Sequence, residues 1–200
     1  MRTICIISNS SLGSFLKFYS EFKNKNIKFF IISSKKIKKK IPKNVKFFYI
    51  SNKNNERFNL YAYEIIKKLN PFRIFLFYTK KINQIIFNNF KTINIHNSFL
   101  PNYKGLNAIK RSFKDQVKLV ISSSHQVTKK FDSGKIMHQI VTPVKLNKLK
   151  YFKNISFLHR VILLEAEINS QSKNYFSIIN NDTIISPGFN KKKITYKFRK

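Results

Sequence analysis

Short runs of consecutive apolar residues recur along this chain, and segments with a helical pattern separate most of them. Apolar runs without polar alternation are typical of strands buried on both faces of a parallel sheet. The predicted strands are residues 3–8, 27–33, 45–50, 73–78, 92–96, 118–123, 124–132 (running into a loop) and 136–144, and the predicted helices are residues 15–22, 56–69, 83–90 and 156–179. This alternation predicts an α/β fold, a single Rossmann-like domain with a mostly parallel central sheet flanked by helices.

The chain of 200 residues is long enough for one domain with a sizeable core. We expect that domain over residues 1–190 and a basic tail over residues 191–200. The only cysteine, Cys5, lies inside an apolar run, so we expect it to be buried, and a reducing compartment is favoured. Lys or Asn interrupts every apolar run before it reaches the length of a signal-peptide core or a membrane span. We therefore expect a soluble cytoplasmic protein without a membrane partner.

The composition is strongly basic, with 40 Lys and Arg against 8 Asp and Glu and a formal net charge of +32. Such a charge attracts polyanions and makes nucleic-acid binding one candidate function. Compositional drift is the second explanation, because Lys, Asn, Ile and Phe, which all have AT-rich codons, dominate the whole chain. No interleaved stripe of Arg and aromatic residues accompanies the charge. We favour drift and expect no specific nucleic-acid partner.

Asn94 and His96 stand at the end of the predicted strand 92–96, just before a loop with Pro, Asn and Gly. Alternate residues of a strand point to the same face, so the two side chains share one side. An amide and an imidazole on one side can bind a carbonyl oxygen that becomes an oxyanion, and the imidazole can move a proton near neutral pH. Judged by the spacing alone, the better explanation is that Asn94 and His96 only provide hydrogen bonds to the loop.

Two longer sequence blocks favour a catalytic role of Asn94 and His96. Residues 94–105 read Asn-Ile-His-Asn-Ser-Phe-Leu-Pro-Asn-Tyr-Lys-Gly, and residues 123–136 read Ser-Ser-His-Gln-Val-Thr-Lys-Lys-Phe-Asp-Ser-Gly-Lys-Ile. The first block resembles the Asn-x-His-x-Ser-x-Leu-Pro motif of the formyltransferase family, and the second is similar to that family's His-x-Val-Thr and Asp-x-Gly-x-Ile pattern. Residues 105–109 and 159–165 resemble the branch of the family that formylates phosphoribosylglycinamide.

The resemblance implies that a formyl group passes from 10-formyltetrahydrofolate, the cosubstrate, to the amine of phosphoribosylglycinamide in purine biosynthesis. Asn94 and His96 would steady the tetrahedral oxyanion. Asp132 would favour the charged form of His96 and relay a proton through water. His125 matches a family histidine and would support the site. No metal is implied, and the Cys and His spacing contains no metal motif.

The resemblance also implies residues that bind the amine substrate. Gly13 and Ser14, at the start of a helix, would hold its phosphate, although Phe15 replaces the Asn that the family has there. An ordinary strand–helix turn with a Ser cap explains Gly13 and Ser14 equally well. Glu165 would bind the ribose hydroxyls, and a solvated helix charge is its alternative interpretation.

The folate contacts follow from the same resemblance. Tyr78 and Lys80 resemble the aromatic and Arg residues of the segment that lines the pterin site, but Lys cannot offer two parallel hydrogen bonds. The loop around Thr128 would add backbone contacts. The expected function is therefore formylation of phosphoribosylglycinamide. The two rivals are a formyltransferase that acts on an amino sugar and a degenerate basic nucleic-acid-binding protein on the same fold.

Overall fold

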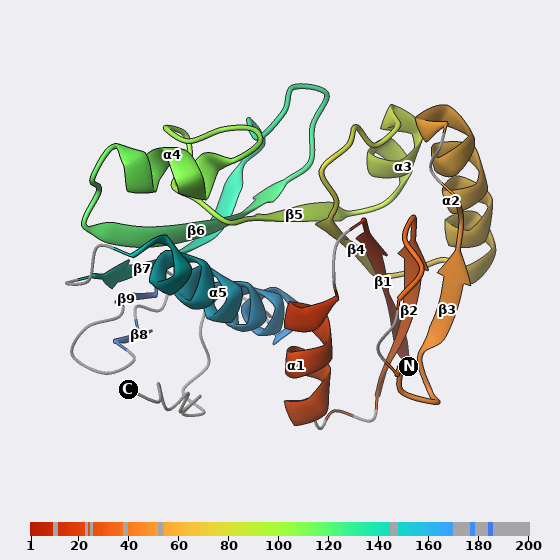
Figure 1. Cartoon of the computed structure of the whole chain (residues 1–200). Helices are drawn as coiled ribbons and strands as arrows, with labels where there is room; N and C mark the ends of the chain where they lie inside the picture. The colour runs from red at the N-terminus through yellow and green to blue at the C-terminus, as the bar shows by residue number, and fades with distance from the viewer. Residues whose placement is uncertain are drawn as a thin grey trace. The chain divides into compact units, whose positions relative to one another are not determined.

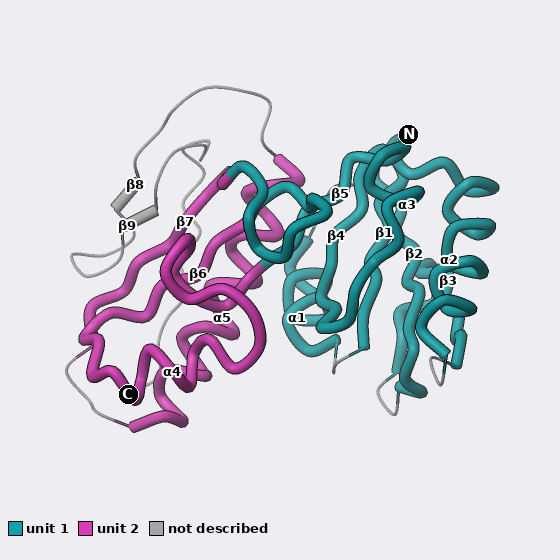
Figure 2. Tube along the Cα trace, turned by 90° about the horizontal axis from the view of Figure 1, so that it is seen from above, with its two compact units in different colours: residues 1–95, 125–135 teal, residues 96–124, 136–200 magenta. Residues whose placement is uncertain are grey.

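The computed structural model describes residues 1–9, 12–22, 24, 26–37, 40–51, 54–144, 148–169, 177–178 and 184–185 (Figure 1). The predicted basic tail over residues 191–200 lies outside the described residues. The chain forms two compact units, coloured separately in Figure 2. Unit 1 consists of residues 1–95 and 125–135, and unit 2 of residues 96–124 and 136–200.

Unit 1 contains parallel strands. They are β1 (Arg2–Ser8), β2 (Ile27–Ser33), β3 (Lys46–Tyr49), β4 (Arg73–Phe77) and β5 (Thr92–His96), and β5 enters unit 2 at its last residue. Their order is β3-β2-β1-β4-β5, and each neighbouring pair is parallel. Cys5 of β1 is fully buried, as predicted, and burial raises the pKa of its thiol well above the ordinary value.

Helices pack on both faces of these strands. They are α1 (Gly13–Glu21), α2 (Asn55–Leu69) and α3 (Gln84–Asn89). Phe15 and Phe18 of α1 contact Phe29 of β2 through ring edges. The next residue of β2, Phe30, joins a core cluster with residues of α2 and α3, because successive strand residues point to opposite faces. Asn54 caps α2 by accepting hydrogen bonds from two backbone N–H groups.

Unit 2 contains the remaining elements. They are α4 (Ala108–Lys114), β6 (Leu119–Gln126), β7 (Ile136–Pro143), α5 (Leu149–Asn169), β8 (Ser177–Ile178) and β9 (Ile184–Ile185), with the last two residues of β6 belonging to unit 1. The order of the strands is β6-β7-β9-β8. β9 pairs antiparallel with both β7 and β8. Phe113 of α4 meets Phe152 of α5 edge-on, and both pack in a small apolar cluster.

The predicted α/β fold with mostly parallel strands and flanking helices is confirmed, whereas two boundaries were wrong. The strand predicted to break between residues 123 and 124 continues as one strand, β6. The helix predicted over residues 156–179 begins at residue 149 and ends at residue 169, and Ser177–Ile178 is a strand. Helix α4 was not predicted. The extent of the domain, residues 1–190, stays a prediction.

β6 continues through Ser123 and Ser124, whose hydroxyl groups find hydrogen-bond partners in unit 2. Ser123 Oγ donates to Ser98 O at 2.9 Å and accepts from Gln139 Nε2 at 2.9 Å. Ser124 Oγ donates to Glu167 Oε1 at 2.5 Å, and the same carboxylate oxygen lies 2.6 Å from His138 Nδ1. Buried polar groups are tolerated where they find such partners.

His159 of α5 is a buried histidine held in its neutral form. It is 1% exposed, and its Nε2 lies 2.8 Å from Thr142 Oγ1 of β7. Burial lowers the pKa of His159 from 6.5 to about 3, because the charged imidazolium loses its hydration inside the protein. The folded pKa therefore lies below the unfolded one, and stability is lost as the pH falls below 6.5.

We expect the substitution His159→Gln to make the protein less sensitive to acid. The wild type should lose on the order of 2 kcal/mol between pH 7 and pH 5 through this group. The introduced glutamine side chain does not titrate and still offers a hydrogen-bonding group to Thr142. Urea unfolding of both proteins at the two pH values measures the difference. An equal loss in both proteins would show that another group causes the acid sensitivity.

Candidate active site

Asn94, His125 and Asp132 meet in unit 1, although they lie far apart in the sequence. Asn94 Nδ2 donates a hydrogen bond to Asp132 Oδ1 at 3.2 Å and lies 3.1 Å from His125 Nε2. His125 Nε2 also lies 3.3 Å from Asp132 Oδ1. The side chains of His125 and Asp132 are only 3% and 10% exposed, so water weakens these contacts little. An amide, an imidazole and a carboxylate thus share one small volume.

The backbone fixes the orientation of the His125 ring. Its Nδ1 lies 2.8 Å from Gln126 O, which can only accept, so Nδ1 carries a hydrogen. In the neutral ring Nε2 is then an acceptor, and Asn94 Nδ2 donates to it. The Asn94 amide therefore directs one N–H to His125 and the other to Asp132.

A tight hairpin after β6 brings Asp132 to this place. Gln126 N donates to Lys135 O at 2.9 Å, and Asp132 adopts a positive φ of 45°. Asp tolerates this conformation better than most residues. A Cβ atom at Gly134 would lie 1.9 Å from Gln126 O, so only glycine fits where the two arms approach.

The third predicted catalytic residue, His96, belongs to unit 2. It is 8% exposed, and its Nε2 lies 2.7 Å from Tyr103 O. That carbonyl can only accept, so Nε2 carries a hydrogen and Nδ1 is the nitrogen that can take up a proton. The structure thus brings Asn94 and Asp132 together within unit 1, and their convergence with His96 stays a prediction. His125, expected to support the site, contacts both residues directly.

The predicted folate residues lie in unit 1. Tyr78 is 9% exposed, stacks on Phe58 with ring centroids 5.0 Å apart, and donates from its hydroxyl to Asn55 Oδ1 at 3.1 Å. Its ring face is therefore occupied by the core. Lys80 and Thr128 are exposed, and Thr128 Oγ1 donates to Lys130 O at 3.0 Å. A folate contact by any of these residues stays a prediction.

The predicted residues for the amine substrate lie in both units. Gly13 is the first residue of α1, and Ser14 is buried at 4% exposure. Phe15 is 1% exposed and belongs to the aromatic core, so its side chain offers nothing polar to a phosphate. Glu165 of α5, in unit 2, is half-buried, whereas all the other residues from 161 to 168 are buried. Binding of phosphate or ribose by these residues stays a prediction.

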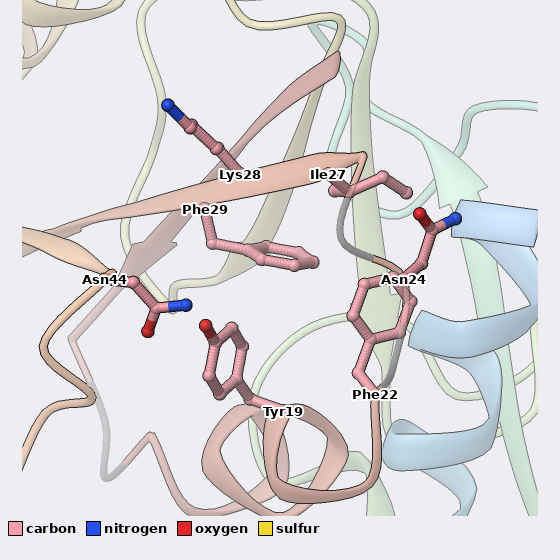
Figure 3. A pocket seen from close by; sticks show the side chains of 7 residues that line it. All are labelled: Tyr19, Phe22, Asn24, Ile27, Lys28, Phe29 and Asn44. Atoms are coloured by element: carbon pink, nitrogen blue, oxygen red, sulfur yellow. The ribbon is translucent and has the colours of Figure 1, made fainter. Parts of the chain in front are cut away.

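A pocket of about 510 Å³ lies at the opposite end of β2 from the predicted site (Figure 3). Its lining residues are Tyr19, Phe22, Asn24, Ile27, Lys28, Phe29 and Asn44. Ile27 is the first residue of β2, whereas ligands of parallel α/β sheets bind beyond the carboxyl ends of strands. No predicted site residue lines this pocket, so we do not assign the reaction to it.

The described residues contain neither a metal-binding cluster nor a membrane span. Among them, no group of at least three His, Cys, Asp or Glu side chains could hold a metal ion. None of the helices in the described ranges is long and apolar enough to cross a lipid bilayer.

Comparison with known proteins places the chain in the formyl transferase family. A family model described as formyl transferase matches residues 1–151. Formyltetrahydrofolate deformylase 2, mitochondrial, of Arabidopsis thaliana is 46% identical over 52 residues, which cover 26% of this chain and 16% of the relative. The formyltetrahydrofolate deformylase of a Synechocystis strain is 29% identical over 124 residues, which cover 58% of this chain and 43% of the relative. Each match thus spans less than half of the relative's length.

Solved structures with the same fold come from two kinds of enzyme. The phosphoribosylglycinamide formyltransferase of Anaplasma phagocytophilum has a TM-score of 0.70 at 18% identity, over 96% of this chain and 95% of that one. A formyltetrahydrofolate deformylase of Pseudomonas putida has a TM-score of 0.66 at 15% identity, over 92% of this chain and 70% of that one. At these identities the likeness concerns the fold alone.

We expect Gly134→Ala to destabilise the protein by about 1–3 kcal/mol, because the new methyl group must displace Gln126 O and disturb the hairpin. Ser133→Ala is the matched control, since Ser133 is the exposed neighbour and its hydroxyl donates to Phe131 O at 2.9 Å. The control should change stability by no more than about 0.5 kcal/mol. Urea midpoints measure both variants, and equal midpoints would contradict the tight approach at Gly134.

Proposed function

Because the chain belongs to the formyl transferase family, whose model matches residues 1–151, we propose that it removes the formyl group of 10-formyltetrahydrofolate and passes it to water. The observation that carries this proposal is the cluster of Asn94, His125 and Asp132. An amide donor beside a carboxylate and an imidazole suits a reaction in which an oxyanion forms and a proton moves. The products would be formate and tetrahydrofolate.

In the proposed mechanism, water attacks the formyl carbon and its oxygen bonds to that carbon. One N–H of the Asn94 amide leaves His125 Nε2 and donates to the formyl oxygen, where it stabilises the negative charge that develops. Asp132 takes up the one proton that water loses and returns it to the folate nitrogen as the carbon–nitrogen bond breaks, and His96, as the resemblance implies, would steady the oxyanion. His125 is anchored at Gln126 O and orients the side chains of Asn94 and Asp132 before water attacks.

Water is the preferred acceptor for two reasons. Phe15 stands where the family has the Asn that binds substrate phosphate, and it lies in an aromatic core with Phe18 and Phe29. A site without that polar side chain holds phosphoribosylglycinamide less well. The curated relatives in Arabidopsis and Synechocystis are also named formyltetrahydrofolate deformylases.

Phosphoribosylglycinamide, the acceptor expected from the sequence, is the second candidate. It is favoured by Glu165, a half-buried carboxylate on a stretch of α5 where every other residue from 161 to 168 is buried. A carboxylate kept accessible in such surroundings can chelate the two hydroxyls of a ribose. In that case the amine nitrogen, in place of water, would bond to the formyl carbon, and the enzyme would serve purine biosynthesis.

Product analysis separates the two acceptors. We expect purified enzyme with 10-formyltetrahydrofolate alone to release formate and tetrahydrofolate in equal amounts. Addition of phosphoribosylglycinamide should leave the formate yield unchanged. Formylated phosphoribosylglycinamide at the expense of formate would identify the second candidate, and a formylated amino sugar would identify a sugar enzyme. No turnover with any acceptor would contradict the proposed chemistry.

The residue roles are tested by Asn94→Ala and His96→Ala. We expect each to lower kcat roughly a hundredfold or more, because each removes a group that acts on the developing charge or the moving proton. Asn89→Ala is the control, since Asn89 is an exposed amide on α3 whose Nδ2 donates to Ile85 O at 2.7 Å. Full turnover of both site variants would reject the assignment.

A further inference from the structure

Asparagine side chains hold the segment that follows β4 in unit 1, residues 78–83, at both of its ends. This segment leaves the sheet beside the candidate active site, because Leu76 of β4 pairs with Asn94 of β5. In parallel α/β sheets, the loops beyond the carboxyl ends of strands line the ligand site. What fixes the backbone of this segment therefore shapes the site.

Asn59 of α2 holds the second half of the segment. Its Nδ2 donates to Lys81 O at 3.2 Å and to Asn55 O at 2.7 Å, and its Oδ1 accepts from Asn83 N at 2.8 Å. Asn59 is only 3% exposed, so these bonds form where water competes little. Asn83 in turn caps α3 by accepting from Ile85 N at 3.0 Å.

Asn55, one turn earlier on α2, binds the segment twice more. Its Nδ2 donates to Lys81 O at 2.9 Å, and its Oδ1 accepts from the Tyr78 hydroxyl at 3.1 Å. The carbonyl of Lys81 thus accepts from two amides. Because the helix cap belongs to Asn54, these contacts are not needed to start α2.

Asn9, the residue after β1, binds the first half of the segment through two hydrogen bonds. Its Nδ2 donates to Thr79 Oγ1 at 2.6 Å, and its Oδ1 accepts from Thr79 N at 3.2 Å. The backbone is thereby fixed at Thr79 and at Lys81, while the Lys80 side chain between them is exposed. A wall with a fixed backbone and two exposed lysine residues, Lys80 and Lys81, suits a flat, anionic substrate.

We propose that Asn9, Asn55 and Asn59 are positioning residues that fix segment 78–83 as one wall of the folate site. The inference rests on the proposed function, because it takes the folate as the ligand. The fixed segment presents its backbone to the substrate without a loss of conformational entropy on binding. Loosening either end therefore weakens folate binding and leaves the chemical step unchanged.

Two mild substitutions loosen the two ends separately. Asn55→Ala removes the bonds to Lys81 O and to the Tyr78 hydroxyl, and Thr79→Val removes the hydroxyl that Asn9 binds while keeping the side-chain shape. Asn89→Ala is again the control, an amide on the neighbouring helix whose Nδ2 donates within that helix. Isothermal titration with tetrahydrofolate gives Kd, and steady-state kinetics with 10-formyltetrahydrofolate give KM and kcat.

We expect Asn55→Ala and Thr79→Val each to raise Kd and KM about fivefold, with kcat within about twofold of the wild type, because one or two hydrogen bonds are lost in each. The control should match the wild type. Folded variants with unchanged Kd, whatever their thermal stability, would overturn the positioning role alone. A wild type that binds no tetrahydrofolate would overturn the proposed function itself.

Discussion

The hydrogen bond from Asn94 to Asp132 joins residues 38 positions apart and ties the end of β5 to the hairpin that follows β6. Three features make it possible. Val127 N donates to Thr92 O at 3.0 Å, which brings the hairpin to β5. Gly134 lets the two arms of the hairpin approach, and a positive φ turns Asp132 inward. His125 then bonds to both partners, so the amide and the carboxylate are oriented before any substrate arrives.

Asparagine side chains form many of the hydrogen bonds that fix helix ends and loops in unit 1. Asn54 and Asn83 cap helices, and Asn9, Asn55 and Asn59 hold segment 78–83. An amide both donates and accepts, so it satisfies the backbone without adding a charge. In a chain with only 8 acidic residues, this chemistry replaces the carboxylates that commonly cap helices and hold loops. A chain with few acidic residues can therefore still form capped helices and fixed loops.

Prediction from the sequence succeeded where one physical effect dominated. The strands at residues 3–8 and 27–33 were found almost to the residue, because continuous apolar runs are explained by burial alone. β6 was divided wrongly, since its serines look like a loop until partners such as Glu167 and Gln139 are known. The end of α5 was also wrong, because the apolar residues Tyr175, Phe176, Ile178 and Ile179 fit a helix or a strand equally well.

The sequence by itself determined the α/β class, because the alternation of apolar runs and helical patterns is a local property of the chain. Its motifs, through their resemblance to the formyltransferase family, marked Asn94, His96 and Asp132 as catalytic candidates. Only the tertiary structure decided what these residues touch. It placed His125 against Asn94 and Asp132, buried the ring of Tyr78 on Phe58 and put Phe15 into the aromatic core. Such contacts join different segments of the chain, and the separation of two segments in the sequence does not tell how far apart they lie in space. The contacts arise only when burial and hydrogen bonding are satisfied together.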